Sequence, residues 1–178
     1  MGISSSSSCS WWRRPTRCLH EARDQMTDVR AKLAELGLTL PVAAKPVAAY
    51  VPAIRTGNLV FTAGQLPLID GAIPSTGKVG AKVSVDEAKR LAQVCALNAL
   101  AAVETVADVN KIVKVVRVVG YVNGEPGFIS QPAVVNGASE LYLHIWGEAG
   151  KHARSAIGVA ELPLDAPVEV ELTVEIAD

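Results

Sequence analysis

The segment HARSAIGVAELPLDAPVEVELTVEI, residues 152–176, decides the fold of this chain. Its first part predicts a short strand that carries Arg154 among very small residues. Its last part, residues 168–176, alternates apolar with polar side chains, as a strand with one buried face does. The connection over 163–167, which begins and ends with proline, is short enough for the two strands to be antiparallel neighbours.

Arg154 is a candidate anion-binding residue. Alternate residues of a strand share a face, so the guanidinium lies beside the small residues Ala156, Gly158 and Ala160. This leaves room for a small anion against the backbone, and the rigid fork of arginine donors fits a carboxylate with two parallel hydrogen bonds. A solvated arginine at a strand end gives the same pattern, so the residues alone leave both interpretations open.

The final strand carries a row of polar side chains on one face: Glu169, Glu171, Thr173 and Glu175. Such a row is typical of a sheet face in contact with water. Alternatively, one of the carboxylates approaches Arg154 from the neighbouring strand, where it can position a water molecule or act as a general base.

The preceding chain predicts a hairpin followed by a glycine-rich connection. Short apolar runs at 48–55 and 58–63 flank Thr56-Gly57, which is a turn signal. The stretch 64–83 contains four glycines and is long for a structureless loop in a compact domain. We therefore expect it to contain a short strand and, in part, to border a site.

Two helices follow from capping and periodicity. Ser84 and Glu87 form a capping-box pattern, and apolar residues recur at helical spacing up to Val106. A valine-rich strand is predicted over 112–122, and Gln131-Pro132 begins a second helix that ends at 147–150.

The resulting order is strands, helix, strand, helix and two strands. It predicts an α+β two-layer domain in which two helices pack on one face of a mixed sheet. Two helices leave the opposite face uncovered, so we expect that face to be buried against other subunits.

Composition restricts the class of protein. The chain has 178 residues, of which 49% are hydrophobic, and Lys+Arg (17) nearly balance Asp+Glu (18) for a formal charge of −1. Nucleic acid is therefore not expected as a main partner, since phosphate neutralisation needs basic surface.

No apolar run reaches the length of a membrane span, so no membrane partner is expected. The three cysteines lack CxxC spacing and fit a reducing, cytoplasmic compartment.

Residues 1–25 differ in composition from the rest, with a serine run and Trp11-Trp12-Arg13-Arg14. They lack the apolar region of a secretory signal. We expect a disordered extension before a single domain over 26–178, in which Met26 resembles a second start and Asp28 caps a short helix ended by Gly37.

Few other residues offer chemistry. No Ser-His-Asp set, phosphate loop or metal cluster stands out, so neither a metal nor a cofactor is expected. Cys95 lies on an apolar helix face and is assigned to core packing. His144 is assigned to packing or the surface, whereas His152, two residues before Arg154, is either structural or part of a site.

Two segments resemble the signatures of the RidA/YjgF family. The first is Tyr50-Val51-Pro52 with TGNLVFTAGQLP over 56–67, and the second runs from Ala153-Arg154-Ser155 through AELP to VEVE at 168–171. Val135-Asn136 is similar to a third element. The resemblance covers about 45–178. The extra length near 124–136 and the glycine-rich turn before Arg154 resemble a divergent subgroup of the family.

The resemblance implies a chorismate-mutase-like fold, with a six-stranded mixed sheet and two helices, assembled as a homotrimer with clefts between subunits. It also implies hydrolysis of reactive enamines and imines, such as 2-aminoacrylate, to 2-oxo acids and ammonia. By this resemblance Arg154 binds the substrate carboxylate and Glu169 holds or activates the attacking water. The side chains of Tyr50 and Asn136 line the cleft, and the Gly64 backbone contacts the substrate.

Two positions depart from the family pattern. Ala156 stands where the family usually has cysteine, and Ala63 where it usually has serine. The family chemistry does not require the thiol as a nucleophile, and the Ala156 backbone can still contact the substrate. Because both positions lack the polar side chain of the family pattern, a more apolar cleft and a different substrate are expected. A ligand-binding trimer without turnover, and an endoribonuclease, remain alternatives.

Overall fold

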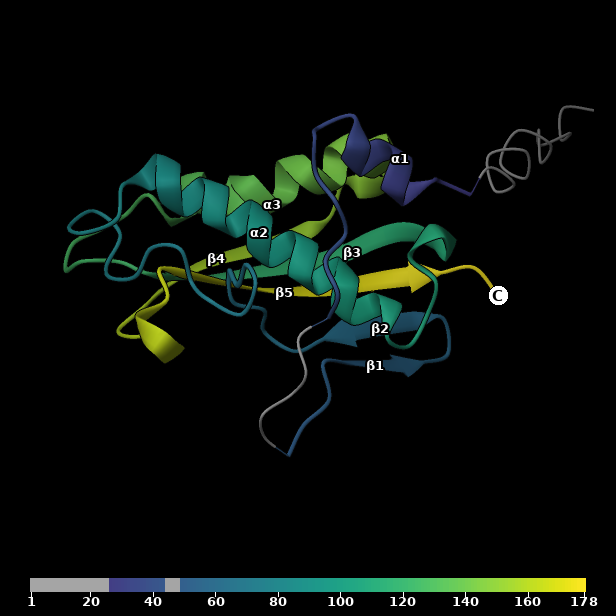
Figure 1. Cartoon of the computed structure of the whole chain (residues 1–178), viewed down its shortest axis with the longest axis horizontal. Helices are drawn as coiled ribbons and strands as arrows, with labels where there is room; N and C mark the ends of the chain where they lie inside the picture. The colour runs from purple at the N-terminus through teal and green to yellow at the C-terminus, as the bar shows by residue number, and fades with distance from the viewer. Residues whose placement is uncertain (1–25, 44–48) are drawn as a thin grey trace, which may run out of the picture.

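The computed structural model describes residues 26–43 and 49–178 (Figure 1). They form one five-stranded sheet, in the order β1-β2-β5-β3-β4, with the long helices α2 and α3 on one face. The predicted α+β two-layer arrangement is confirmed. The predicted extension over 1–25 and the beginning of the predicted strand at residue 48 lie outside the described residues.

The first two strands are short and the next three are longer. Strand β1 spans Ala53–Thr56 and pairs antiparallel with β2, Leu59–Thr62, around the predicted turn at Thr56-Gly57. Strands β3, β4 and β5 span Ile112–Asn123, Ala153–Val159 and Val168–Ile176. Strand β5 pairs antiparallel with both β2 and β3, and it has the alternating burial that its sequence predicts.

Strand β4 is the parallel neighbour of β3, with Val118 opposite Arg154 and Gly120 opposite Ala156. The expectation that β4 and β5 are antiparallel neighbours is therefore wrong, because β3 lies between them. The cause is the connection through α3, since a strand–helix–strand unit places its two strands parallel to each other. The short 163–167 connection, which contains the 3-10 turn Pro163–Asp165, thus crosses over the end of β3.

The five strands replace the six that the resemblance implied. The glycine-rich stretch 64–83 forms no strand, so the strand expected there is absent. Its backbone instead makes isolated bridges, from Gln65 to Val170 of β5 and from Val79 to Gly124. Positive φ angles at Gly71, Gly77 and Gly80 turn this chain too sharply for a longer ladder.

Helix α2 spans Val85–Glu104 and α3 spans Gln131–Trp146, followed by the 3-10 turn Gly147–Gly150. The Ser84 side chain caps α2 by accepting from the Glu87 amide at 3.2 Å, as predicted. The Glu87 carboxylate does not complete the predicted capping box. It accepts from Arg90 and Ser75 instead.

The core lies between the two helices and the facing side of the sheet. It contains Val118 and Leu172 together with the apolar faces of α2 and α3. Cys95 is fully buried there, its thiol lies 3.6 Å from the Val168 carbonyl oxygen, and burial raises its pKa well above the ordinary value. The assignment of Cys95 to core packing is confirmed.

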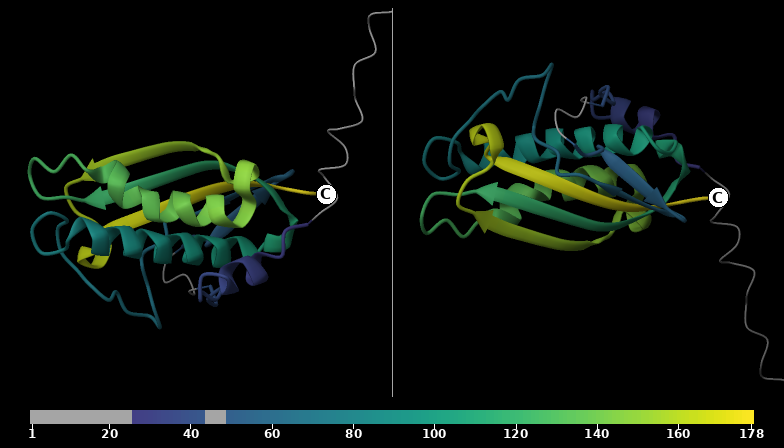
Figure 2. Two further views of the ribbon diagram at one scale, coloured as in Figure 1. Left: turned by 90° about the horizontal axis from the view of Figure 1, so that it is seen from above. Right: turned by 90° about the horizontal axis from the view of Figure 1, so that it is seen from below.

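The opposite face of the sheet is not covered by α2 or α3 (Figure 2). Apolar side chains from three strands are exposed on it, namely Ile54, Phe61 and Ile157. A face with this much exposed apolar surface is typical of one that packs against another protein surface.

The short helix α1, Val29–Ala34, packs across α3. Asp28 caps it through a 2.9 Å bond from the Ala31 amide, as predicted. Of the helices that the structure describes, none combines the length and apolar character needed to cross a membrane.

Candidate active site

Arg154 lies on the edge strand β4 and points to the helix-covered side of the sheet. Its strand partner Val118 is fully buried against the helices, and paired residues of a sheet share a face. The Nη1 atom of Arg154 donates to the Asn136 side-chain oxygen at 2.7 Å and to the Ser139 hydroxyl at 3.1 Å. Helix α3 therefore holds one end of the guanidinium.

The other end of the guanidinium remains available. Among the described residues, no acceptor is recorded for Nε or Nη2 of Arg154. These two nitrogens present parallel N–H groups along one edge, which is the geometry that a carboxylate accepts. The guanidinium borders a cavity of about 240 Å³ that is also lined by Ser139, Leu143, Lys151 and His152.

His152 extends this group of polar residues. Its Nδ1 lies 2.7 Å from the Gly150 carbonyl oxygen, and its Nε2 lies 3.0 Å from the Ser139 hydroxyl. Burial, followed by the charges of Arg154 and Lys114, lowers the pKa of His152 below its ordinary value. The imidazole is therefore neutral near pH 7.

Ser139 was not identified from the sequence. It is only 8% exposed and links His152 to Arg154. The signal was its spacing of three residues from Asn136, which places both polar side chains on the same helix face. A polar pair on a face that is otherwise apolar needs a partner, and Arg154 is that partner.

Glu169 lies on the opposite side of the sheet from Arg154. It is half-buried on β5, and the buried Val168 and Val170 beside it face the helices. Burial, followed by the charge of Glu171, raises the pKa of Glu169 above its ordinary value. Tyr121 donates to Glu171 at 3.3 Å, so that carboxylate has a hydrogen-bond donor of its own.

Gly64 lies directly against the Glu169 carboxylate. A Cβ atom at residue 64 would overlap Oε1 of Glu169 and lie 2.7 Å from Cδ. The backbone after β2 also pairs with β5 at this point through Gln65 and Val170. Gly64 is thus required for the close approach of this backbone to the carboxylate.

The residues expected at the site fall into two groups within one chain. Arg154, Asn136 and Ala156 lie together on the helix-covered side near β4, whereas Gly64 and Glu169 lie together on the uncovered side near β5. Tyr50 is half-exposed just before β1, at the opposite edge of the sheet from β4. The predicted approach of a carboxylate to Arg154 from a neighbouring strand does not occur, because β3 separates the two strands.

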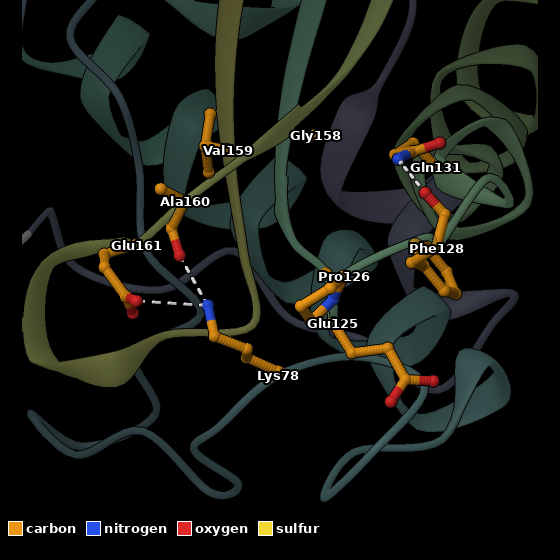
Figure 3. Close-up of a pocket in the computed structure, with 10 residues that line it drawn as sticks. Lys78, Glu125, Pro126, Phe128, Gln131, Gly158, Val159, Ala160 and Glu161 are labelled. Carbon is orange, nitrogen blue, oxygen red and sulfur yellow. Dashed lines mark hydrogen bonds and ion pairs between the residues drawn. The ribbon is translucent and has the colours of Figure 1, made fainter.

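A larger cavity of about 420 Å³ lies at the ends of β3 and β4 (Figure 3). It is lined by Lys78, Glu125, Phe128, Gln131 and residues 158–161, among others. The Lys78 ammonium donates to Asn123 at 2.8 Å and to the Ala160 carbonyl, and it pairs with Glu161 at 3.2 Å. All three of its protons are thus used within the chain, so this lysine is structural.

Replacing Lys78 with methionine is expected to destabilise the fold by about 1–3 kcal/mol. The Asn123 side chain is fully buried and would lose the donor to its oxygen. Urea unfolding measures the effect. Lys89→Met is the matched control, since the exposed Lys89–Glu140 pair contributes about 0–1 kcal/mol. Equal urea concentrations at the unfolding midpoints of the two variants would contradict the structural role of Lys78.

Comparison with known proteins places this architecture in a family. The profile described as "YjgF/chorismate_mutase-like, putative endoribonuclease" matches residues 30–176. Protein TCP17 of Trypanosoma cruzi is 41% identical over 150 residues, which cover 83% of this chain and 94% of that protein.

Two solved structures are similar in both sequence and fold. The protein Atu1372 of Agrobacterium tumefaciens, described as of unknown function, is 42% identical with a TM-score of 0.78, over 89% of this chain and 98% of its own. A Shewanella oneidensis protein named as a putative endoribonuclease is 31% identical with a TM-score of 0.79. The match covers 83% of this chain and 99% of the Shewanella chain. The sequence signatures, the sheet topology and these matches together show that the chain belongs to the YjgF/RidA family with a chorismate-mutase-like fold.

Proposed function

We propose that this protein hydrolyses reactive enamine and imine intermediates that carry a carboxylate, releasing 2-oxo acids and ammonia. The observation that carries the proposal is the Arg154 guanidinium, which α3 holds at Nη1 while its Nε and Nη2 edge has no acceptor in the part of the chain that the structure describes. That edge anchors the substrate carboxylate with two parallel hydrogen bonds.

Glu169 supplies the acid–base chemistry of the proposed reaction. A carboxyl group whose pKa is raised toward neutrality exchanges protons more effectively near pH 7 than one at its ordinary value. The enamine first tautomerises to the imine. Water then attacks the C=N carbon as Glu169 takes its proton, and the nitrogen gains a proton. The C–N bond of the resulting carbinolamine breaks, a C=O bond forms, and ammonia leaves.

A complete site on this basis requires a second copy of the chain. Arg154 and Glu169 lie on opposite sides of one sheet, and Tyr50 lies at the far edge from Arg154. The uncovered sheet face, with exposed Ile54, Phe61 and Ile157, supports its burial between subunits. We therefore place the substrate in clefts of a homotrimer, where one subunit supplies Arg154 and another supplies Glu169.

The proposal is tested with imines generated in situ by an amino-acid oxidase. The protein is expected to accelerate release of the 2-oxo acid and ammonia above the spontaneous rate for at least one small side chain. Absence of acceleration across the panel would contradict hydrolysis. Calorimetric binding of pyruvate without any acceleration would instead support the alternative, a trimer that binds small carboxylates without turnover.

The name of the Shewanella relative raises ribonuclease activity as a second candidate. The near-zero net charge of this chain gives little electrostatic support for RNA binding. A nuclease assay that compares wild type with Arg154→Ala, both purified identically, decides between ribonuclease and deaminase activity. RNA cleavage that depends on Arg154 would contradict the deaminase proposal.

Replacing Glu169 with glutamine is expected to abolish turnover but raise the melting temperature near pH 7, because the neutral amide has no charge to desolvate. A carboxyl with a raised folded-state pKa favours folding below its unfolded value of about 4.3 and loses this contribution as the pH rises through the folded pKa. The stability difference between variant and wild type should therefore shrink on acidification. Calorimetric scans across pH measure it, and a difference that grows at acid pH would contradict the raised pKa.

A further inference from the structure

Four polar groups beside α3 form one continuous chain of three hydrogen bonds. It runs from the Gly150 carbonyl to His152, from His152 to Ser139, and from Ser139 to Arg154, with donor–acceptor distances of 2.7, 3.0 and 3.1 Å. We infer that His152 is a positioning residue, which acts through Ser139 to fix the Arg154 guanidinium. The inference rests on the proposed function, in which that guanidinium anchors a carboxylate.

The two ends of the chain fix the directions of its outer hydrogen bonds, and the neutral state of the ring fixes the direction of the middle one. The Gly150 carbonyl can only accept, so Nδ1 of His152 carries the ring proton. Nε2 of the neutral ring then accepts, and the Ser139 hydroxyl donates to it. The lone pairs of the hydroxyl remain for Arg154, which can only donate. A neutral histidine therefore satisfies each group without conflict.

The surroundings of His152 favour this neutral state and fixed orientation. The ring is half-buried and packs edge-on against Tyr142, with ring centroids 6.1 Å apart and an interplanar angle of 82°. The charges that act on it are those of Arg154 and Lys114, and both disfavour a second proton. An imidazole held in this way keeps the Ser139 hydroxyl proton pointing away from Arg154.

The consequence for Arg154 is a defined orientation. Asn136 and Ser139 both accept from Nη1, and within 26–43 and 49–178 no group accepts from the Nε and Nη2 edge of the guanidinium. Without the histidine acceptor, the Ser139 hydroxyl is free to rotate, and its lone pairs no longer face Nη1 in a fixed direction. His152 thus contributes to ligand binding without contacting the ligand.

The first test is binding of pyruvate by calorimetry to His152→Phe and Ser139→Ala. Phenylalanine keeps the contact with Tyr142 but has no ring nitrogen. Each variant is expected to weaken binding by about tenfold, and the double variant by no more than Ser139→Ala alone, because both act on the same bond. The matched control is His144→Phe, since His144 lies on α3 but pairs with Glu35 instead.

The positioning role of His152 is contradicted if His152→Phe weakens pyruvate binding by the same factor in an Arg154→Ala protein as in the wild type. His152 would then act independently of Arg154. Normal pyruvate affinity of a folded His152→Phe protein would also contradict it. If His152→Phe does not fold, Ser139→Ala carries the comparison, because it removes only the hydroxyl.

A second measurement does not depend on activity. Side-chain NMR of Arg154 in the wild type is expected to show distinct Nη1 and Nη2 signals with slow exchange, and Ser139→Ala or His152→Phe should speed this exchange about tenfold. Unchanged exchange in both variants would overturn the positioning role even if the protein is an active deaminase. Faster exchange in a protein without deaminase activity would support the hydrogen-bond chain while the proposed function fails.

Discussion

Replacing Arg154 with alanine is expected to lower kcat/KM for imine hydrolysis by about a hundredfold or more. A bidentate, charge-assisted contact contributes roughly 1.5–3 kcal/mol, and about 1.4 kcal/mol corresponds to tenfold. Loss of orientation at the reacting carbon adds to this effect. Arg154→Lys should recover only part of the activity, because an ammonium keeps the charge but not the planar fork.

The effect of Arg154→Ala should appear in catalysis and not in folding. Arg154 is exposed in the single chain, its Nη1 partner Ser139 lines the cavity, and its other partner Asn136 is partly exposed, so water can replace the guanidinium at both. Initial rates with in-situ imine measure the loss. Arg55→Ala is the control, because Arg55 is exposed and, among the described residues, its one recorded acceptor is the nearby Gly57 carbonyl. Equal rates for Arg154→Ala and Arg55→Ala would contradict the anchor.

Replacing Gly137 with alanine is expected to destabilise the protein by about 3 kcal/mol or more. Alanine normally stabilises a helix interior relative to glycine by about 1 kcal/mol, so the sign here is reversed. A Cβ at residue 137 would overlap the Lys89 carbonyl oxygen and lie 2.9 Å from its carbon and 3.2 Å from the Gln93 nitrogen. These are backbone atoms of α2, so the two helices would have to move apart.

Thermal unfolding measures this cost, which corresponds to a fall in Tm of roughly 6–12 °C for a domain of this size. Gly158→Ala is the matched control, because the nearest atoms to its added Cβ belong to the flexible Gln131 side chain. An unchanged Tm for Gly137→Ala would show that α2 and α3 do not cross as closely as the structure places them.

Local signals predicted the elements of this fold well. The capping serine at residue 84, the proline in the first turn of α3 and the alternation over 168–176 each determine backbone geometry within a few residues. The predicted pairing of β4 with β5 is wrong, because the connection through α3 places β4 parallel to β3, whereas a short connection such as 163–167 is compatible with neighbouring and with non-neighbouring strands. The strand expected within 64–83 does not form, because glycines with positive φ angles interrupt the ladder of hydrogen bonds.

The candidate site was less accessible from the sequence. The resemblance identified Asn136 as a residue that lines the cleft, and the structure places its side-chain oxygen 2.7 Å from Nη1 of Arg154. The hydrogen bond between Ser139 and Arg154 depends on the position of α3 over β4. The contact of Gly64 with Glu169 depends on the path of the backbone after β2. These are tertiary relations that no single strand or helix pattern contains. Their roles in catalysis remain predictions.

Mixing two inactive variants tests the central claim most directly, namely that Arg154 of one subunit and Glu169 of another form one deaminase site. Arg154→Ala and Glu169→Gln are unfolded together in equal amounts, refolded and assayed with in-situ imine. Random assembly of trimers leaves about one quarter of the sites with both native residues, so about one quarter of wild-type activity is expected. Activity no higher than that of the separate variants would contradict a site shared between subunits.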